Sequence, residues 1–133
     1  MKSGKILCLL GAGFFLIYGF LFAIFPTQFS EFVTGGIHST SSSLIDMRAT
    51  YGGMSIAIGL VLIILAIKIE TLRTAVVCLL LLMTCMASTR SIGMFIDGSP
   101  NVVMYIYLFV ELVVVALCLN WLRFPRNEKI ISS

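Results

Sequence analysis

The chain has 133 residues, of which 59% are hydrophobic and only 11% are charged. Because a soluble domain carries about 25% charged residues, this composition excludes an ordinary soluble domain and indicates one integral membrane domain, residues 1–133. The formal net charge of +3 is small and the basic residues fall at the ends of apolar runs, which argues against nucleic-acid binding.

A run of apolar residues follows the basic start of the chain at residues 2–5 and predicts a first transmembrane helix over residues 6–25. The core of a signal peptide spans only about 7–15 residues and precedes an A-x-A-like cleavage site. This run is longer and no such site follows it, so we expect the helix to be retained.

A short amphipathic helix is predicted after the first transmembrane helix. Pro26 ends that first helix or begins the next short one, because proline has no backbone N–H to donate. Phe25, Phe29 and Phe32 then recur at helical spacing, which indicates a helix lying in the membrane interface. The glycine pair at 35–36 is expected to end it, and a loop rich in serine and threonine follows that can cap the next helix.

Three further apolar runs predict transmembrane helices over residues 44–67, 74–96 and 102–122. They are separated by a charged turn at residues 68–73 and by a turn at residues 97–101 that contains glycine and proline. The predicted fold class is therefore all-α: an antiparallel bundle of four transmembrane helices, with a short interfacial helix between the first and the second.

Small residues mark the helix faces that are expected to pack closely. Small residues let helix backbones approach each other in membranes, so these faces should lie against neighbouring helices rather than lipid. In the first helix they are Gly11, Gly13 and Gly19, and in the second Gly52, Ser55 and Gly59 share one face with Arg48.

Basic residues are distributed unequally between the two sides of such a bundle. The two loops on one side, residues 27–43 and 97–101, contain no lysine or arginine. Because cytoplasmic loops carry an excess of these residues, we expect both termini to lie in the cytoplasm. The basic residues on the cytoplasmic side are Lys2, Lys5, Lys68, Arg73, Arg123, Arg126 and Lys129.

Three charged residues lie inside the apolar runs, where each charge costs roughly 2.5–3.5 kcal/mol on insertion scales. At about 1.5 Å of rise per residue, Arg48 lies roughly 6 Å, Arg90 roughly 10 Å and Glu111 roughly 13 Å below the non-cytoplasmic surface. Asp46 and Asp97 lie at the rim above them. Since charges in a membrane usually face one another or a cavity, we predict that all of them form one polar cluster in the outer half of the bilayer.

Two tyrosines complete the candidate site. Tyr51 lies one helical turn after Arg48, and Tyr107 shares a helical face with Glu111. Methionines at positions 83, 86 and 104 are expected to line an apolar part of the site. The predicted ligand-binding residues are Asp46, Arg48, Tyr51, Arg90, Asp97, Tyr107 and Glu111.

Neither a metal site nor a cofactor site is predicted. The only histidine, His38, lies in the polar loop without cysteine or histidine neighbours. The four cysteines, Cys8, Cys78, Cys85 and Cys118, all lie in apolar runs and form no C-x-x-C pair. We therefore expect them to pack as small apolar residues.

Several motifs together resemble a bacterial family of small four-helix membrane proteins that is known only as a domain of unknown function. They are D-x-R-x-x-Y-G-G in the second helix, R-x-x-G-x-x-x-D-G-x-P closing the third, and a glutamate in the fourth. The resemblance covers nearly the whole chain and implies a four-helix membrane bundle, but no reaction. We expect the bundle to lie in the bacterial inner membrane. The residues concerned are Asp46, Arg48, Tyr51, Gly52, Gly53, Arg90, Gly93, Asp97, Gly98, Pro100 and Glu111.

Three functions are compatible with these features. The first, which we favour, is a binding or accessory protein that holds a membrane lipid or another amphipathic small molecule. The second is a small membrane enzyme that uses Glu111 as acid or base, although no nucleophile–base pair, metal set or cofactor motif is recognisable. The third is a structural subunit, as a homo-oligomer or a scaffold for a membrane-protein partner, in which the charges form only an ion-pair network.

Overall fold

The computed structural model describes residues 2–36, 40–98 and 100–123. In these residues all regular structure is helical, which confirms the predicted all-α class. Helices α1 (Lys2–Ile24), α5 (Leu72–Asp97) and α6 (Val102–Arg123), together with a continuous helical stretch over Ser41–Ile67, are each long and apolar enough to cross a membrane. The predicted short helix is α2 (Pro26–Thr34).

The stretch over Ser41–Ile67 has three parts: α3 (Ser41–Met47), the π-helical segment η1 (Arg48–Gly53) and α4 (Met54–Ile67). It begins slightly earlier than predicted because Thr40 caps it, with Oγ1 accepting from Ser43 N over 3.3 Å. His38 of the polar loop and Arg126 and Lys129 of the basic tail, which were named in the sequence predictions, lie outside the described residues.

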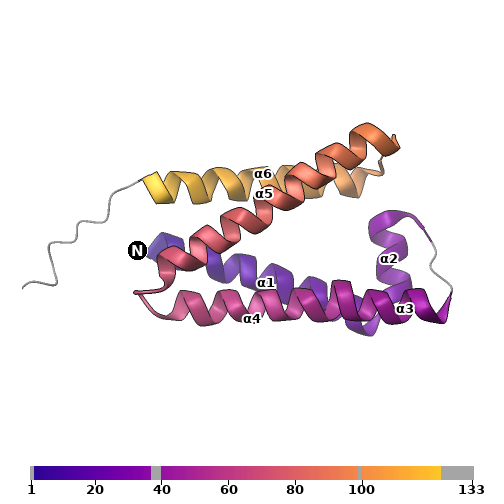
Figure 1. The fold of residues 1–133 in the computed structure, drawn as a ribbon, viewed down its shortest axis with the longest axis horizontal. Coiled ribbons are helices and arrows are strands. Elements are labelled where there is room, and N and C mark those ends of the chain that lie inside the picture. The colour runs from indigo at the N-terminus through magenta and orange to yellow at the C-terminus, as the bar shows by residue number, and fades with distance from the viewer. Residues whose placement is uncertain (1, 37–39, 99, 124–133) are drawn as a thin grey trace, which may run out of the picture.

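The helices form two antiparallel pairs that converge at one end and diverge at the other (Figure 1). α1 packs along η1 and α4, and α5 packs along α6. The pairs converge where the turn at residues 68–71 joins α4 to α5, at the same end as the start of α1 and the end of α6. At the divergent end α2 lies between α6 and α3 and contacts both (Figure 1).

The apolar core draws on all four membrane-length stretches. Its fully buried thiols, Cys8 and Cys118, pack as small apolar side chains. Near α2 the packing is between aromatic rings. The Phe29 ring centroid lies 4.9 Å from that of Phe22 and 5.5 Å from that of Tyr18. The buried core residues are Cys8, Ala12, Phe15, Leu62, Ala66, Leu72, Ala75, Val76, Leu79, Met83 and Cys118.

The close approach of α1 to η1 and α4 depends on small residues, as predicted for Gly19, Gly52 and Gly59. A Cβ atom at Gly19 would lie 2.8 Å from the carbonyl oxygen of Gly52, closer than real Cβ atoms come to other atoms. A Cβ atom at Gly59 would lie 2.7 Å from Leu16 Cγ. At Gly13, in contrast, no atom lies within 4 Å of the Cβ position, so the close packing predicted there is wrong.

Asn101, the residue before α6, donates a hydrogen bond to α2. Asn101 Nδ2 donates to Val33 O over 2.9 Å. Gly35 ends the helix in the left-handed region, with φ at 75°, a conformation that glycine adopts without the steric cost of a Cβ atom. Phe32 of α2 and Phe25, which precedes this helix, stay exposed, as expected for side chains that face lipid.

Candidate functional site

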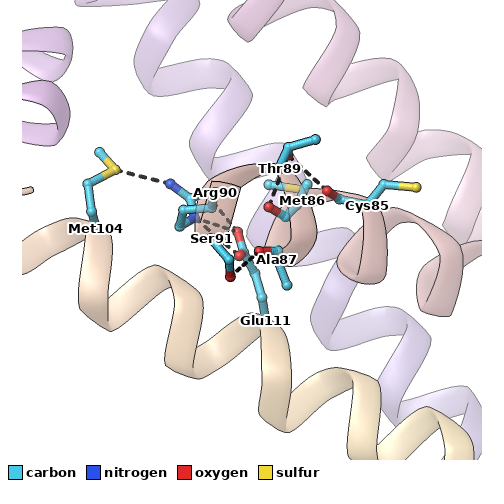
Figure 2. A network of polar contacts seen from close by, with 8 residues as sticks. All are labelled: Cys85, Met86, Ala87, Thr89, Arg90, Ser91, Met104 and Glu111. Carbon is cyan, nitrogen blue, oxygen red and sulfur yellow. Dashed lines mark hydrogen bonds and ion pairs between the residues drawn. The ribbon is translucent and has the colours of Figure 1, made fainter. Parts of the chain in front are cut away.

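The charged residues inside α5 and α6 form an ion pair that joins the two helices (Figure 2). Arg90 Nη2 donates to Glu111 Oε1 over 2.7 Å. Arg90 Nε lies 3.2 Å from Oε1 and 3.1 Å from Oε2, so both carboxylate oxygens accept from the guanidinium. Because Glu111 is only 4% exposed, its charge would be buried without a partner if Arg90 were absent.

A methionine and a tyrosine of α6 contact the rest of the Arg90 guanidinium. Nη1 donates to Met104 Sδ over 3.1 Å, and Cζ lies 5.3 Å from the centroid of the Tyr107 ring, within the range of a cation–π interaction. Met104, Tyr107 and Glu111 follow one another at spacings of three and four residues and so share one face of α6. A thioether is a weak acceptor, so Nη1 has the weakest hydrogen-bond partner of the Arg90 donors.

The hydroxyl groups near the pair bond to their own helix. Ser91 Oγ donates to Ala87 O over 2.7 Å, and Thr89 Oγ1 donates to Cys85 O over 2.8 Å (Figure 2). These local bonds satisfy the hydroxyls within α5. Among the described residues no hydroxyl or thiol donates to Glu111, so the structure holds no nucleophile–base pair at this carboxylate.

A row of aromatic rings leads from the ion pair to η1. The ring centroid of Tyr107 lies 6.3 Å from that of Tyr18, which lies 4.9 Å from that of Phe22. Phe22 in turn stacks on Tyr51 of η1, with the centroids 5.2 Å apart. We call Tyr107, Tyr18, Phe22 and Tyr51 the aromatic row, and its two central rings belong to α1.

The sequence prediction did not include the two central rings of the aromatic row, Tyr18 and Phe22. A signal for them was present, because Phe14, Tyr18 and Phe22 repeat every four residues in the first helix. Residues four apart lie above one another on a helix. The repeat therefore indicates an aromatic face, which the structure places against α6 and η1.

Arg48 lies beyond the aromatic row and bonds to the backbone rather than to a carboxylate. Its Nη1 donates to Ala23 O in the last turn of α1, where helix carbonyls lack intrahelical partners. Asp46 accepts from Thr50 Oγ1 over 3.2 Å. Because Asp46, Arg48 and Tyr51 are all exposed, this end of the site is open at the molecular surface.

The single cluster of charges that the sequence predicts is not formed. Among the residues that the structure describes, the one ion pair within 4.0 Å is Arg90–Glu111, which Asp46, Arg48 and Asp97 do not join. The physical reason is the position of α1, which packs against η1 on one side and against α5 and α6 on another. Asp97 is the exposed last residue of α5, about two turns beyond Arg90.

The motif around Arg48 adopts the π-helical geometry of η1 (Arg48–Gly53). Met54 N donates to Ala49 O, five residues earlier, so the turn is wider than in an α-helix. A Cβ atom at Gly52 would lie 3.0 Å from Ala23 N, so the wide turn packs against the same residue of α1 that accepts from Arg48. Single π-helical turns are rare and are frequent at functional sites.

No curated protein and no solved structure matches the chain. A family model does match it, over residues 4–122, which include the ion pair, the aromatic row and η1. The description of that family as a domain of unknown function agrees with the uncharacterised family that the motifs resemble. The chain therefore belongs to the family DUF4345, a domain of unknown function.

Proposed function

We propose that the protein binds a membrane lipid or another amphipathic small molecule at Arg90, and we favour binding over catalysis. The observation that carries this proposal is the hydrogen bond from Arg90 Nη1 to Met104 Sδ. A charge in an apolar helix costs roughly 2.5–3.5 kcal/mol on insertion scales. Despite this cost, one of the N–H donors of Arg90 has only a weak acceptor. A carbonyl or phosphate oxygen of a ligand would be a better partner for that donor.

The surroundings of Arg90 suit an amphipathic molecule. The Arg90 side chain is 19% exposed, so a ligand can contact this side chain while Glu111 stays bound to it. The aromatic row offers apolar ring surface next to this donor. At the far end of the row the exposed Arg48 has further N–H groups besides the one that donates to Ala23 O. A polar head and an apolar body would both find partners along this path.

Catalysis by Glu111 fits the same geometry less well. A general base must lie within hydrogen-bond reach of the proton that it abstracts. Both oxygens of Glu111 already accept from Arg90, and the residue is almost completely buried. A purely structural role would account for the ion pair, but it would not require a partly exposed Arg90 side chain whose fourth hydrogen bond goes to a thioether.

Native mass spectrometry of the gently solubilised protein tests the proposal. We expect the wild type to carry a discrete co-purifying molecule. The double substitution Arg90→Met with Glu111→Leu removes both charges together, a change that often leaves buried sites folded. We expect this variant to unfold at a temperature close to that of the wild type and to have lost the bound molecule.

The matched control is the double substitution Arg73→Met with Glu70→Leu. It removes the same two kinds of charge from exposed positions near the turn between α4 and α5, so the bound molecule should be retained. A wild type without a discrete ligand would overturn the proposal in favour of a structural ion pair. Retention of the ligand by the folded Arg90→Met, Glu111→Leu variant would show that the site lies elsewhere.

We also propose that both termini face the cytoplasm, in the inner membrane of a bacterium. The start of α1, the turn at residues 68–71 and the end of α6 lie at one end of the molecule (Figure 1). The positive-inside rule assigns an end that carries lysine and arginine to the cytoplasm. The basic residues described there are Lys2, Lys5, Lys68, Arg73 and Arg123.

A further inference from the structure

A groove lies between the first turns of α1 and the last turns of α6, at the convergent end of the helices. Its volume is about 410 Å³, within the range of about 300–1,000 Å³ that is common for small-molecule sites. Ile6 and Leu10 of α1 and Leu117 of α6 supply apolar lining, and Ser3 and Asn120 supply polar lining. None of these residues belongs to the site around Arg90.

Close contact between α1 and α6 places Trp121 in the lining of this groove. A Cβ atom at Gly4 would lie 2.4 Å from Trp121 Cε2, so only glycine lets the indole lie against the first turns of α1. Tryptophan is enriched at membrane–water interfaces, where its ring sits at the level of the lipid head groups. Trp121 is also the only tryptophan in the chain.

The groove is polar at its outer end and apolar deeper in the membrane-length helices. Ser3 and Asn120 lie near the ends of α1 and α6, whereas Leu10 lies about two turns further along α1. Leu117 lies about one turn further into α6 than Asn120. This order matches a phospholipid, which has its head group at the membrane surface and its acyl chains below.

Three basic residues lie close in sequence to the residues at the polar end of the groove. They are Lys2, Lys5 and Arg123, and all are exposed. Within residues 2–36, 40–98 and 100–123 none of them has a carboxylate within 4.0 Å. Their positive charges are therefore not neutralised by an ion pair with these residues. Basic groups next to a membrane attract anionic lipids in preference to uncharged ones.

We propose that this groove binds an anionic phospholipid, with an acyl chain along its apolar lining and the phosphate at its polar end, where the ends of α1 and α6 carry the three basic residues. A zwitterionic phospholipid would fill the apolar part equally well but would gain less from the three positive charges. The groove is a second lipid site, independent of the ligand at Arg90. It lies at the end of the molecule that the distribution of basic residues assigns to the cytoplasmic leaflet.

Quenching of Trp121 fluorescence tests this site, because the signal comes from one residue in the groove lining. The full-length protein is reconstituted into phosphatidylcholine vesicles that contain equal mole fractions of either phosphatidylglycerol or phosphatidylcholine with brominated acyl chains. Bromine quenches tryptophan at contact distance, so we expect stronger quenching by the brominated phosphatidylglycerol. Substitution of Lys2→Gln with Lys5→Gln should reduce this preference by up to about fivefold per charge, and Arg123→Gln should act in the same direction.

The matched control is Lys68→Gln with Arg73→Gln, which removes two positive charges from the same end of the molecule but not from the ends of α1 and α6. This variant should keep the wild-type preference. Equal quenching of the wild type by the two brominated lipids would overturn the proposal. An equal loss of preference in both double variants would also overturn it, because the preference would then come from general attraction to the charged surface.

Discussion

Arg90 reaches Glu111 through three hydrogen bonds of 2.7 to 3.2 Å, in a region where few other polar side chains are available. Moving two ions out of water is costly, and short bonds between the ions offset that cost only while both are present. Removal of one partner should therefore harm the protein more than removal of both.

The substitution Arg90→Ala is expected to lower the free energy of unfolding by about 3 kcal/mol or more, because it leaves a buried carboxylate without a partner. The double substitution Arg90→Met with Glu111→Leu should lower it much less. Thermal unfolding in detergent, followed by circular dichroism, compares the two variants. Equal stability of the single and double variants would mean that the pair is not desolvated.

A substitution of Met104 tests the role of the Arg90 Nη1 donor without removing the ion pair. Met104→Leu keeps the side-chain volume, so it should change stability by less than about 1.5 kcal/mol. We expect native mass spectra of this variant to retain more ligand, because Nη1 then has no acceptor from residue 104. Met86→Leu is the control: this methionine, also predicted to line the site, packs against the core, whereas Met104 is the methionine that accepts from Arg90. Loss of ligand in Met104→Leu alone would contradict the role given to Nη1.

At the scale of elements, α1 is the helix against which the others pack. It contacts α2, η1, α4, α5 and α6. One of its faces carries small residues against η1 and α4, and another carries the aromatic rings that lie between α6 and Tyr51 of η1 and also meet α2. This division of its surface explains why Arg48 and Arg90 lie at opposite ends of the aromatic row rather than side by side.

Two alanine substitutions in α1 separate close packing from helix propensity. Gly19→Ala should lower the free energy of unfolding by about 1–3 kcal/mol, because its Cβ atom would overlap the backbone of η1. Gly13→Ala should be neutral or stabilising by about 0.5–1 kcal/mol, because its Cβ position is open and alanine favours the helix. Thermal unfolding of the two variants in the same detergent measures the difference. Similar effects at both positions would contradict the close contact at Gly19.

The helices could be predicted from sequence because the length of an apolar run and the residues that cap a helix are local features of the chain. The π-helical geometry of η1 could not, because it is selected by packing, with Gly52 against Ala23 of a separate helix. Arg90 and Glu111 meet as their depth predicts, since a short turn keeps α5 and α6 side by side. Arg48 does not join them, because the depth of a residue in the membrane does not determine which neighbouring helix its face packs against.

At the scale of the whole molecule, orientation follows from the end at which the basic residues lie. Alkaline phosphatase is active only outside the cytoplasm, and green fluorescent protein requires the cytoplasm in such fusions. We expect phosphatase activity from a fusion after Gly98, in the turn after α5, and fluorescence from a fusion after Ile69, in the turn before it. The reverse pattern would place both termini outside the cytoplasm and the Arg90 site in the inner half of the bilayer.

The position of α2 has a mechanical consequence for the surrounding bilayer. At the convergent end the membrane-length stretches pack alone, whereas at the other end α2 is inserted between α6 and α3 and held there by Asn101. The described helices therefore occupy a larger cross-section at the α2 end than at the convergent end, which in a bilayer gives one leaflet a wider inclusion than the other. A flat bilayer must bend or crowd its lipids around such an inclusion, so the protein should enrich where the leaflet at its α2 end is convex. Partitioning between vesicles of small and large diameter would measure this preference for curvature.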